Sequence, residues 1–554
     1  MRRLVITLAM GTLALAAVFA TTAAAGNGNP GFKTDVDEML DGRSGWTTEA
    51  IISVGDTLGG GYTFEAIPDG IAVERINGQG TADILVNHEL SLVPFPATRQ
   101  DHINSTVSKL RLHQKSAGVL KGDYVIPQSA GYQRFCSNFL VGKEHGFARE
   151  LLLTNEEARD IVLRAEDSWE PGLTLATPNT EQAGVVVAYD VKSGEHRSIY
   201  GMGRHNHENS VGIPGYGYPV VLSGDDTFDA PASQLYLYKA ASGADVWNDN
   251  GKLYAFVADN PAINDYGDVT EAMGPVAGHF IEVPREIATG KDTDDGSEVT
   301  SADFGYPLPS ASPTTVPPYN KPATPNMPDG PQWVLEHWSN ENNVFQFIRV
   351  EDIAYDRRPG MSRVVYFADT GEPRAKPSAI PGWTRLERSA TGGGNYMNGR
   401  IFKLTLGSNP LEGATLDILP GADFDVGYNR ADAVHQPDNI ETTAEGLYIQ
   451  EDTGSHNASF AGATNARIWR YPFSTGVEEV IAEVNQAIPG APPLGPAAWE
   501  SSGIVDASSI FGPGAFLVDV QAHGWDTEIP GGNDPPAIPK RENGQLLLLR
   551  APGS

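Results

Sequence analysis

The stretch Phe135–Leu140 reads Phe-Cys-Ser-Asn-Phe-Leu, and a polar link joins it to Glu150–Glu157, which reads Glu-Leu-Leu-Leu-Thr-Asn-Glu-Glu. The first stretch holds the only cysteine of the chain, Cys136. The second is a short apolar run, typical of a β-strand, that ends in two adjacent glutamates. A single cysteine has no internal partner for a disulfide, so the thiol is a buried side chain, a reactive group or a metal ligand.

Short apolar runs that end in polar or acidic residues recur along the chain. Ala82–Val86 is followed by Asn-His-Glu, Val220–Ser223 by Gly-Asp-Asp, Trp333–Leu335 by Glu-His, and Gly446–Gln450 by Glu-Asp-Thr-Gly. No sustained helical period lies between these runs, so βαβ units are not expected. Many short strands with irregular self-similarity predict an all-β fold, and at this length they favour a β-propeller over a pair of β-sandwiches.

The chain divides into a leader and one long domain. Residues 1–25 start with a basic Met-Arg-Arg, continue through an apolar core and end in small residues, which predicts an export signal peptide and a periplasmic or extracellular protein. Residues 26–50 are polar and are predicted to form an arm. Residues 51–554 are predicted to form a single propeller, in which the Pro-, Ser- and Thr-rich segment at about 292–331 is a long loop between blades.

The charge of the chain is strongly acidic. Lysine and arginine number 39, aspartate and glutamate 70, and 39 − 70 gives −31. This charge opposes binding to nucleic acid and to anionic lipid, both of which attract basic surfaces. Most of it is interpreted as the solvated surface of an exported protein, and the clustered acids as possible ligands of hard cations. No stretch after residue 25 is apolar enough to predict a membrane span.

In a propeller, the inner strands run beside a central channel. Carboxylates and amides at one end of several such strands can therefore converge. Taken singly, each is more often a turn cap or a solvated side chain. The candidates are Glu89, Glu156, Glu157, Glu208, Asp225, Asp226, Glu351, Asp352, Asp438, Asn439, Glu441 and Asp452.

Three of the candidate motifs allow two interpretations each. Arg204–Glu208 reads Arg-His-Asn-His-Glu, which suits a transition metal or a polar surface turn. Arg349, beside Glu351, offers a bidentate fork for phosphate or forms an ordinary ion pair. Cys136 is a small buried side chain or, as a thiolate, a soft ligand that favours iron or zinc. No Gly-x-Ser-x-Gly elbow or Walker loop supports other hydrolase chemistry.

Taken together, these motifs resemble the PhoX-type alkaline phosphatases, exported calcium-dependent β-propellers. The matching segments spread over most of the mature chain: Cys136, Leu151–Glu157, Gly203–Glu208, Ser223–Asp226, Leu235–Lys239, Arg349–Ile353, Tyr366–Gly371 and Pro437–Ile440.

The resemblance implies a six-bladed, monomeric phosphomonoesterase that acts on small phosphate esters through a mixed iron and calcium centre. Cys136, Glu208 and Glu351 would be iron ligands, with Cys136 and Glu351 also counted as catalytic. Arg349 would hold the phosphate. Calcium would be held by the four residues Glu89, Glu156, Asp438 and Asn439.

Two other functions remain open from the sequence. One is a calcium-only propeller hydrolase, phytase-like or lactonase-like, which the acid- and histidine-bearing segments Trp499–Ile504 and Asp519–Gly524 would suit. The other is a secreted propeller that binds a partner without catalysis. A propeller fold does not decide between these functions.

Overall fold

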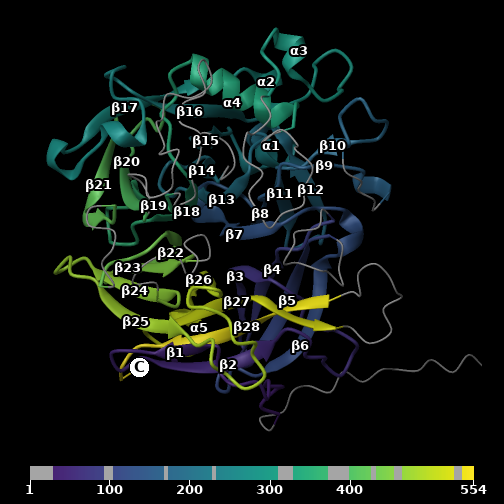
Figure 1. Cartoon of the computed structure of the whole chain (residues 1–554), viewed down its shortest axis with the longest axis vertical. Helices are drawn as coiled ribbons and strands as arrows, with labels where there is room; N and C mark the ends of the chain where they lie inside the picture. The colour runs from purple at the N-terminus through teal and green to yellow at the C-terminus, as the bar shows by residue number, and fades with distance from the viewer. Residues whose placement is uncertain are drawn as a thin grey trace, which may run out of the picture.

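A computed structural model describes residues 29–92, 104–166, 172–226, 232–309, 328–371, 398–425, 432–453, 464–528 and 540–553. The fold is all-β with a few short helices and a propeller-like arrangement of sheets (Figure 1). The predicted signal peptide lies outside the described residues, and so does the middle of the predicted loop at 292–331. The described parts of that loop include helix α3 (Ser301–Phe304).

Four sheets are separate blades of antiparallel strands. Two have four strands in simple order: β3 (Pro68–Asn77), β4 (Thr81–His88), β5 (Thr106–His113), β6 (Val119–Ile126); and β7 (Phe135–Val141), β8 (Leu151–Glu156), β11 (Val186–Asp190), β12 (His196–Ile199). The other two sheets each include one strand from the N-terminal part of the chain. One consists of β22 (Pro437–Thr442), β23 (Gly446–Glu451), β24 (Arg467–Pro472) and β25 (Glu479–Val484), and β1 (Leu40–Gly42) pairs with β25. The other consists of β26 (Glu500–Asp506), β27 (Ala515–Glu528) and β28 (Lys540–Arg550), and β2 (Thr47–Ser53) pairs with β28.

The fifth large sheet has nine strands and curls until its two end strands, β13 and β18, contact each other. Its order is β13 (His207–Gly212), β14 (Val220–Asp225), β15 (Leu235–Lys239), β16 (Lys252–Ala258), β17 (Val276–Glu282), β21 (Ala414–Asp423), β20 (Arg400–Thr405), β19 (Val364–Asp369), β18 (Val350–Tyr355). A small ribbon joins β9 (Ile161–Val162) and β10 (Glu181–Gln182). The remaining helices are α1 (Gly243–Trp247), α2 (Arg285–Thr289), α4 (Pro331–Glu341) and α5 (Ser508–Phe511).

Six strands form a closed ring at the centre of the molecule. β3, β7, β13, β18, β22 and β26 contact one another in this order, and β26 contacts β3. Figure 1 shows these strands nearest the middle, with the partners of each leading outwards. Apolar side chains fill the spaces between neighbouring sheets, as in the clusters around Phe347, Leu153 and Leu517. We call these six the inner strands, and the strand that follows each one (β4, β8, β14, β19, β23, β27) a second strand.

Two sequence predictions differ from the observed fold. Two parts of the segment 26–50, predicted as an arm, lie in strands: Leu40–Gly42 forms β1 and Thr47–Ala50 starts β2, and these strands extend two C-terminal sheets. Trp333–Leu335, predicted as a strand, lies in helix α4. All three of its residues are buried, so this short apolar run carries no periodicity that separates a strand from a buried helix. Pro331 at the first helical turn is the signal for the helix start.

Candidate metal centre

Five of the six inner strands begin with the same backbone device. The first residue of each pairs with the last residue of its second strand, and the register then shifts. Such a bulge sets two residues of the inner strand opposite one of the partner and re-aims their side chains. The second residue of each of these strands is an acid or the thiol: Asp69, Cys136, Glu208, Glu351 and Asp438.

These five side chains belong to one run of ligand atoms. Among the described residues, four groups of three side chains each bring their ligand atoms within 4.8 Å of one another. Neighbouring groups share Cys136, Glu208 and Asp438, so the groups join end to end. They are Asp69, Glu89 and Cys136; Cys136, Glu157 and Glu208; Glu208, Glu351 and Asp438; and Asp438, Asp452 and Glu500. We call these nine residues the channel group.

Cys136 lies where two of these groups meet. Its Sγ is 3.2 Å from Asp69 Oδ2 and 3.2 Å from Glu208 Oε1. The neighbouring Ser137 hydroxyl donates to the same Glu208 oxygen at 2.8 Å. Burial, and the carboxylates around it, raise the pKa of the Cys136 thiol well above its ordinary value. The chain alone therefore disfavours a thiolate here, and a bound cation would favour one.

The carboxylates of the channel group carry more negative charge than nearby cations balance. Burial and mutual repulsion raise the pKa of Glu157, Glu208, Glu351 and Asp438 well above their ordinary values. The same causes raise the pKa of Glu89 to about 8. Buried acids of like charge remain ionised together only when cations neutralise them. A donor set of carboxylates and one thiol therefore fits metal ions.

Arg349 is the buried cation of the group. Its Nε and Nη2 donate to the two Asp226 oxygens at 2.8 and 2.9 Å, and Nη2 lies 2.9 Å from Glu351 Oε1. Asp452 Oδ2 lies 3.9 Å from Nη1. The guanidinium thus sits between Asp226 on one side and two channel-group acids on the other, and only 7% of the residue is exposed.

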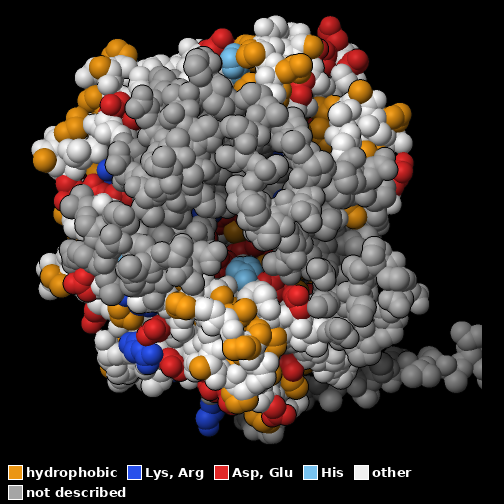
Figure 2. Space-filling model, viewed as in Figure 1, with side chains coloured by type: hydrophobic (Ala, Val, Ile, Leu, Met, Phe, Trp, Pro, Cys, Tyr) orange, Lys and Arg blue, Asp and Glu red, His pale blue; other side chains and the backbone are white. Residues whose placement is uncertain are grey.

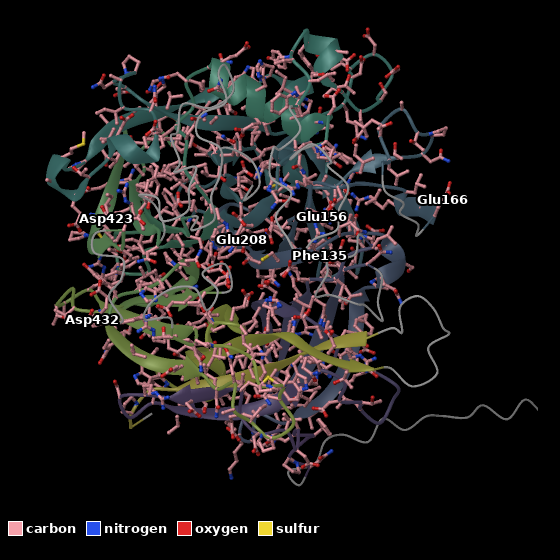
Figure 3. All side chains as sticks on the ribbon, in the orientation of Figure 1. Phe135, Glu156, Glu166, Glu208, Asp423 and Asp432 are labelled. Carbon is pink, nitrogen blue, oxygen red and sulfur yellow. The ribbon has the colours of Figure 1, made fainter. Side chains whose placement is uncertain are left out.

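The structure keeps Glu156 out of the channel group. Its carboxylate accepts backbone N–H groups of Gln133 at 2.7 Å and Gly184 at 3.1 Å, and it pairs with Arg164. The next residue, Glu157, has its ligand atom in the channel group instead. Successive side chains of an extended chain point to opposite sides, so only one of two adjacent glutamates can face the channel. Figure 3 labels Glu208 near the middle of the ring and Glu156 towards the sheet of β8.

Other sequence candidates brace the ring. Asn439 on β22 accepts from Ser502 Oγ on the neighbouring β26 at 3.1 Å and donates to Ser137 Oγ on the non-neighbouring β7 at 3.0 Å. Asp352 on β18 links its two neighbours in the ring, because it accepts from Asn209 on β13 and from the Ile440 N–H on β22.

Three further candidates have partners of their own. Glu441 pairs with Arg357 at 3.0 Å. His207 bonds to Ser223 at 2.8 Å and to the Gly203 carbonyl at 3.1 Å, and Asp225 Oδ1 lies 3.9 Å from His205. None of the three belongs to the four groups of ligand atoms that the described residues form.

Sequence reasoning missed two members of the channel group. Asp69 does not follow an apolar run, but Pro68-Asp69 recurs as Pro437-Asp438 at the start of another inner strand, and this repeat was a usable signal. Glu500 was considered only as part of a calcium-only alternative. Its Oε1 lies 3.6 Å from His523 Nε2, whose Nδ1 lies 2.7 Å from Glu542 Oε1. Figure 2 shows acidic and histidine side chains in a recess at the middle of the face.

Comparison with known proteins shows the fold. No protein-family model and no curated protein matches the chain. The structure resembles that of Pseudomonas fluorescens PhoX in complex with vanadate, a transition-state analogue, with a TM-score of 0.56 and 16% identity over 95% of this chain and 97% of that one. A protein of unknown function from Dyadobacter fermentans (TM-score 0.40, 9% identity, 92% and 100% covered) and Penicillium chrysogenum α-L-arabinanase with arabinobiose (0.36, 11%, 90% and 98%) are also similar.

In the described part of the chain, no helix is long and apolar enough to span a membrane. The described structure is thus an all-β, PhoX-like fold with a run of possible metal ligands along its inner strands.

Proposed function

We propose that the protein is an exported, metal-dependent phosphomonoesterase of the alkaline phosphatase type, acting on small phosphate esters in the periplasm or outside the cell. The observation that carries this proposal is the channel group, in which one thiol and eight carboxylates form four overlapping metal-ligand sets next to a buried arginine. The likeness to a phosphatase structure that holds vanadate supports the same chemistry.

The proposed fold is a six-bladed propeller. Its basis is the closed ring of six inner strands. The nine-stranded sheet divides into two blades, β13–β17 and β18–β21, joined by the short pairing of Val276–Gly278 with Ala414–Leu416. Six inner strands then give six blades around one channel.

The proposed metal ligands follow from the donor atoms. Cys136, Glu208 and Glu351 suit iron, because a thiolate with carboxylates suits a softer cation than calcium. Glu89 and Asp438 suit calcium, which takes oxygen ligands only. Glu157 replaces Glu156 as a calcium ligand, since Glu156 is bound by backbone N–H groups and Arg164. Asn439 braces the ring rather than holding metal.

Bound metal would supply positive charge and a water whose pKa is lowered towards about 7. The chain's own contribution is position and charge. Asp226 binds the Nε and Nη2 of Arg349 and fixes the guanidinium, so its Nη1 edge would meet a phosphoryl oxygen without reorganising. Thr370 donates to Glu351 Oε1 at 2.9 Å and holds that carboxylate in place beside Arg349. Such fixed groups stabilise the charge that spreads over the phosphoryl oxygens during transfer.

The test is phosphate release from an aryl phosphate at alkaline pH by mature protein loaded with iron and calcium. We expect turnover that a chelator abolishes and added metal restores. Cys136→Ser should lose iron, measured by elemental analysis, and lose about 100-fold or more in kcat/KM while the circular dichroism spectrum is unchanged. Glu144→Gln, on a side chain 71% exposed, is the control. A folded, metal-loaded protein without turnover would overturn the proposal.

A further inference from the structure

A second acidic site lies behind the channel group, where the last sheet of the ring meets the first. Asp519 is in β27, and its register partners are Ser502 on β26 and Leu546 on β28. Leu517 and Leu546 pack with Ile67 and Ile71 in the core beside β3, whereas Val518 and Val520 pack on the other face of the sheet. Alternation along the strand therefore aims Asp519 towards β3.

Asp519 is fully buried and carries a carboxylate with no donor. Its exposure is 0%, and neither of its oxygens has a hydrogen-bond partner among the described residues. Asp519 stands two places before Gln521, the register partner of the first residue of β26. The equivalent residue in the other second strands is Val86, Thr154, Ser223, Phe367 or Ile449. Among the six second strands, only β27 thus has an acid at this position. A buried carboxylate without donors is costly, so this one calls for a partner outside the protein.

Further unsatisfied oxygens surround Asp519. Gln521, on the same face of β27, donates its Nε2 to Asp69 Oδ2 at 3.0 Å, which leaves Gln521 Oε1 and Asp69 Oδ1 buried and without partners in the described structure. Burial, and then repulsion by the Asp69 carboxylate, raise the pKa of Asp519 well above its ordinary value. Three carboxylate oxygens and one amide oxygen are therefore buried in this part of the described structure without a hydrogen-bond donor.

We infer that Asp519, Asp69 and Gln521 form a buried calcium site that ties the last sheet of the propeller to the first. The donor set is all oxygen with two negative charges, which suits Ca²⁺, and carbonyl oxygens or water commonly fill its remaining positions. The site is distinct from the channel group because Asp519 is not part of that group, although Asp69 belongs to both. Its role is structural and does not depend on the phosphatase proposal.

The position of the site gives it a function. β26 and β3 come close at Gly503, where a Cβ atom would lie only 2.6 Å from the Asp69 carbonyl oxygen. Asp69 and Gln521 are 452 residues apart in sequence, so a cation held by both strands joins the two ends of the chain. A cation that binds only the folded chain stabilises it by mass action, and here it would do so by holding strands from the two ends of the chain together. Calcium would thus hold the ring closed.

The experiment compares the wild type with Asp519→Asn and Asp519→Leu. Calcium and iron are counted by elemental analysis after dialysis, and melting temperatures are measured in excess Ca²⁺ and in excess EGTA. We expect Asp519→Asn to lose one calcium per chain with iron unchanged. It should melt below the wild type in Ca²⁺ and above it in EGTA, because the substitution removes both the cation and the repulsion with Asp69. Asp519→Leu, which matches the apolar surroundings, should show the same inversion if the asparagine variant folds poorly.

Two controls separate this site from other effects. Asp356→Asn also alters a fully buried carboxylate, but that carboxylate is bound by Arg358 and Tyr366, so its destabilisation should be the same with and without calcium. Cys136→Ser should keep the calcium that Asp519→Asn loses, which separates this site from a failure of the channel centre. Unchanged calcium content in both Asp519 variants, or a melting temperature that is not lowered in Ca²⁺, would overturn the inference.

Discussion

Glu156 and Glu157 are adjacent in sequence, yet they have opposite surroundings. Glu156, the last residue of β8, is bound by backbone N–H groups and Arg164. Glu157 faces Cys136 and Glu208 in the channel group, where burial and repulsion raise its pKa. Glu451 and Asp452 repeat the pair at the end of β23. Glu451 is bound by the His435 N–H, Arg467 and Trp469, and Asp452 belongs to the channel group.

Because successive side chains of a strand point to opposite sides, these adjacent acids fall into two kinds: those bound within a blade and those facing the channel. Glu156 and Glu451, which end their second strands, secure their blades because backbone and side-chain donors of the protein bind them. Glu157 and Asp452, one residue later, face the channel, where other acids surround them. The first kind should affect stability and the second should affect metal binding. Four predictions test this division.

The largest effect is expected at Glu208, which two ligand groups share. Glu208→Gln should lower kcat/KM for an aryl phosphate by about 1,000-fold, or about 4 kcal/mol, because it removes a charged ligand from the centre. Metal-free Glu208→Gln should melt no lower than the metal-free wild type, since one of the repelling charges is gone. A variant with nearly full activity would place Glu208 among the structural acids.

Glu156→Gln should be costly to stability instead. The substitution removes the nearer of two carboxylates from the partly buried Arg164, whose Nη2 also lies 3.6 Å from Glu181 Oε1. Losing one partner of such a hydrogen-bonded pair costs about 1–3 kcal/mol. Urea unfolding of metal-free Glu156→Gln and of the metal-free wild type would measure this loss of unfolding free energy. The matched Glu157→Gln should leave the unfolding free energy unchanged or raised. Equal losses in the two variants would contradict the division by alternation.

Arg349→Lys tests the buried cation that pairs with Asp226 and lies beside the channel-group acids Glu351 and Asp452. Lysine keeps the charge but cannot pair with both Asp226 oxygens, so its position is less well fixed. We expect a loss of about 10- to 100-fold in kcat/KM with metal content retained. Steady-state kinetics together with elemental analysis would check this. Loss of the metals themselves would instead assign Arg349 to holding the ligands.

The smallest effect is the pH dependence of the metal-free protein. The folded-state pKa of Glu89 is raised from 4.5 to about 8, so the folded chain keeps a proton that the unfolded chain releases. This contribution to stability is complete below pH 4.5 and is lost as the pH rises towards 8. The melting temperature of the chelated protein should therefore fall between pH 5 and pH 9. The metal-loaded protein should change much less over this range, and equal slopes would argue against metal neutralisation.

Much of the fold and part of the site could be predicted from the sequence. The apolar runs at β4, β8, β14, β19 and β23 were predicted as strands, because the residues of these strands are buried almost throughout. The sequence placed their acidic ends on inner strands, whereas the structure makes them second strands. The inner strands are less apolar, since their first residues face the channel. Helix α4 was mistaken for a strand because its apolar run is short and buried on all sides.

The limits at the site have a similar origin. Cys136, Glu208, Glu351, Asp438 and Glu89 were predicted, and the structure brings them together. The choice between Glu156 and Glu157 depends on where β8 ends, and a shift of one residue reverses it. The sequence shows Asp519 only as part of a motif, because an acid between Val518 and Val520 carries no sign of how deeply it is buried. Its burial is set by β3, which is distant in sequence.

The most direct test of the division is the metal content of three purified proteins: the wild type, Glu156→Gln and Glu157→Gln, each loaded with iron and calcium and dialysed in the same way. The account predicts bound metal in the wild type, the same content in Glu156→Gln, and at least one equivalent less in Glu157→Gln. A wild type that retains no metal, or a Glu157→Gln protein that retains all of it while Glu156→Gln loses some, would contradict the central claim.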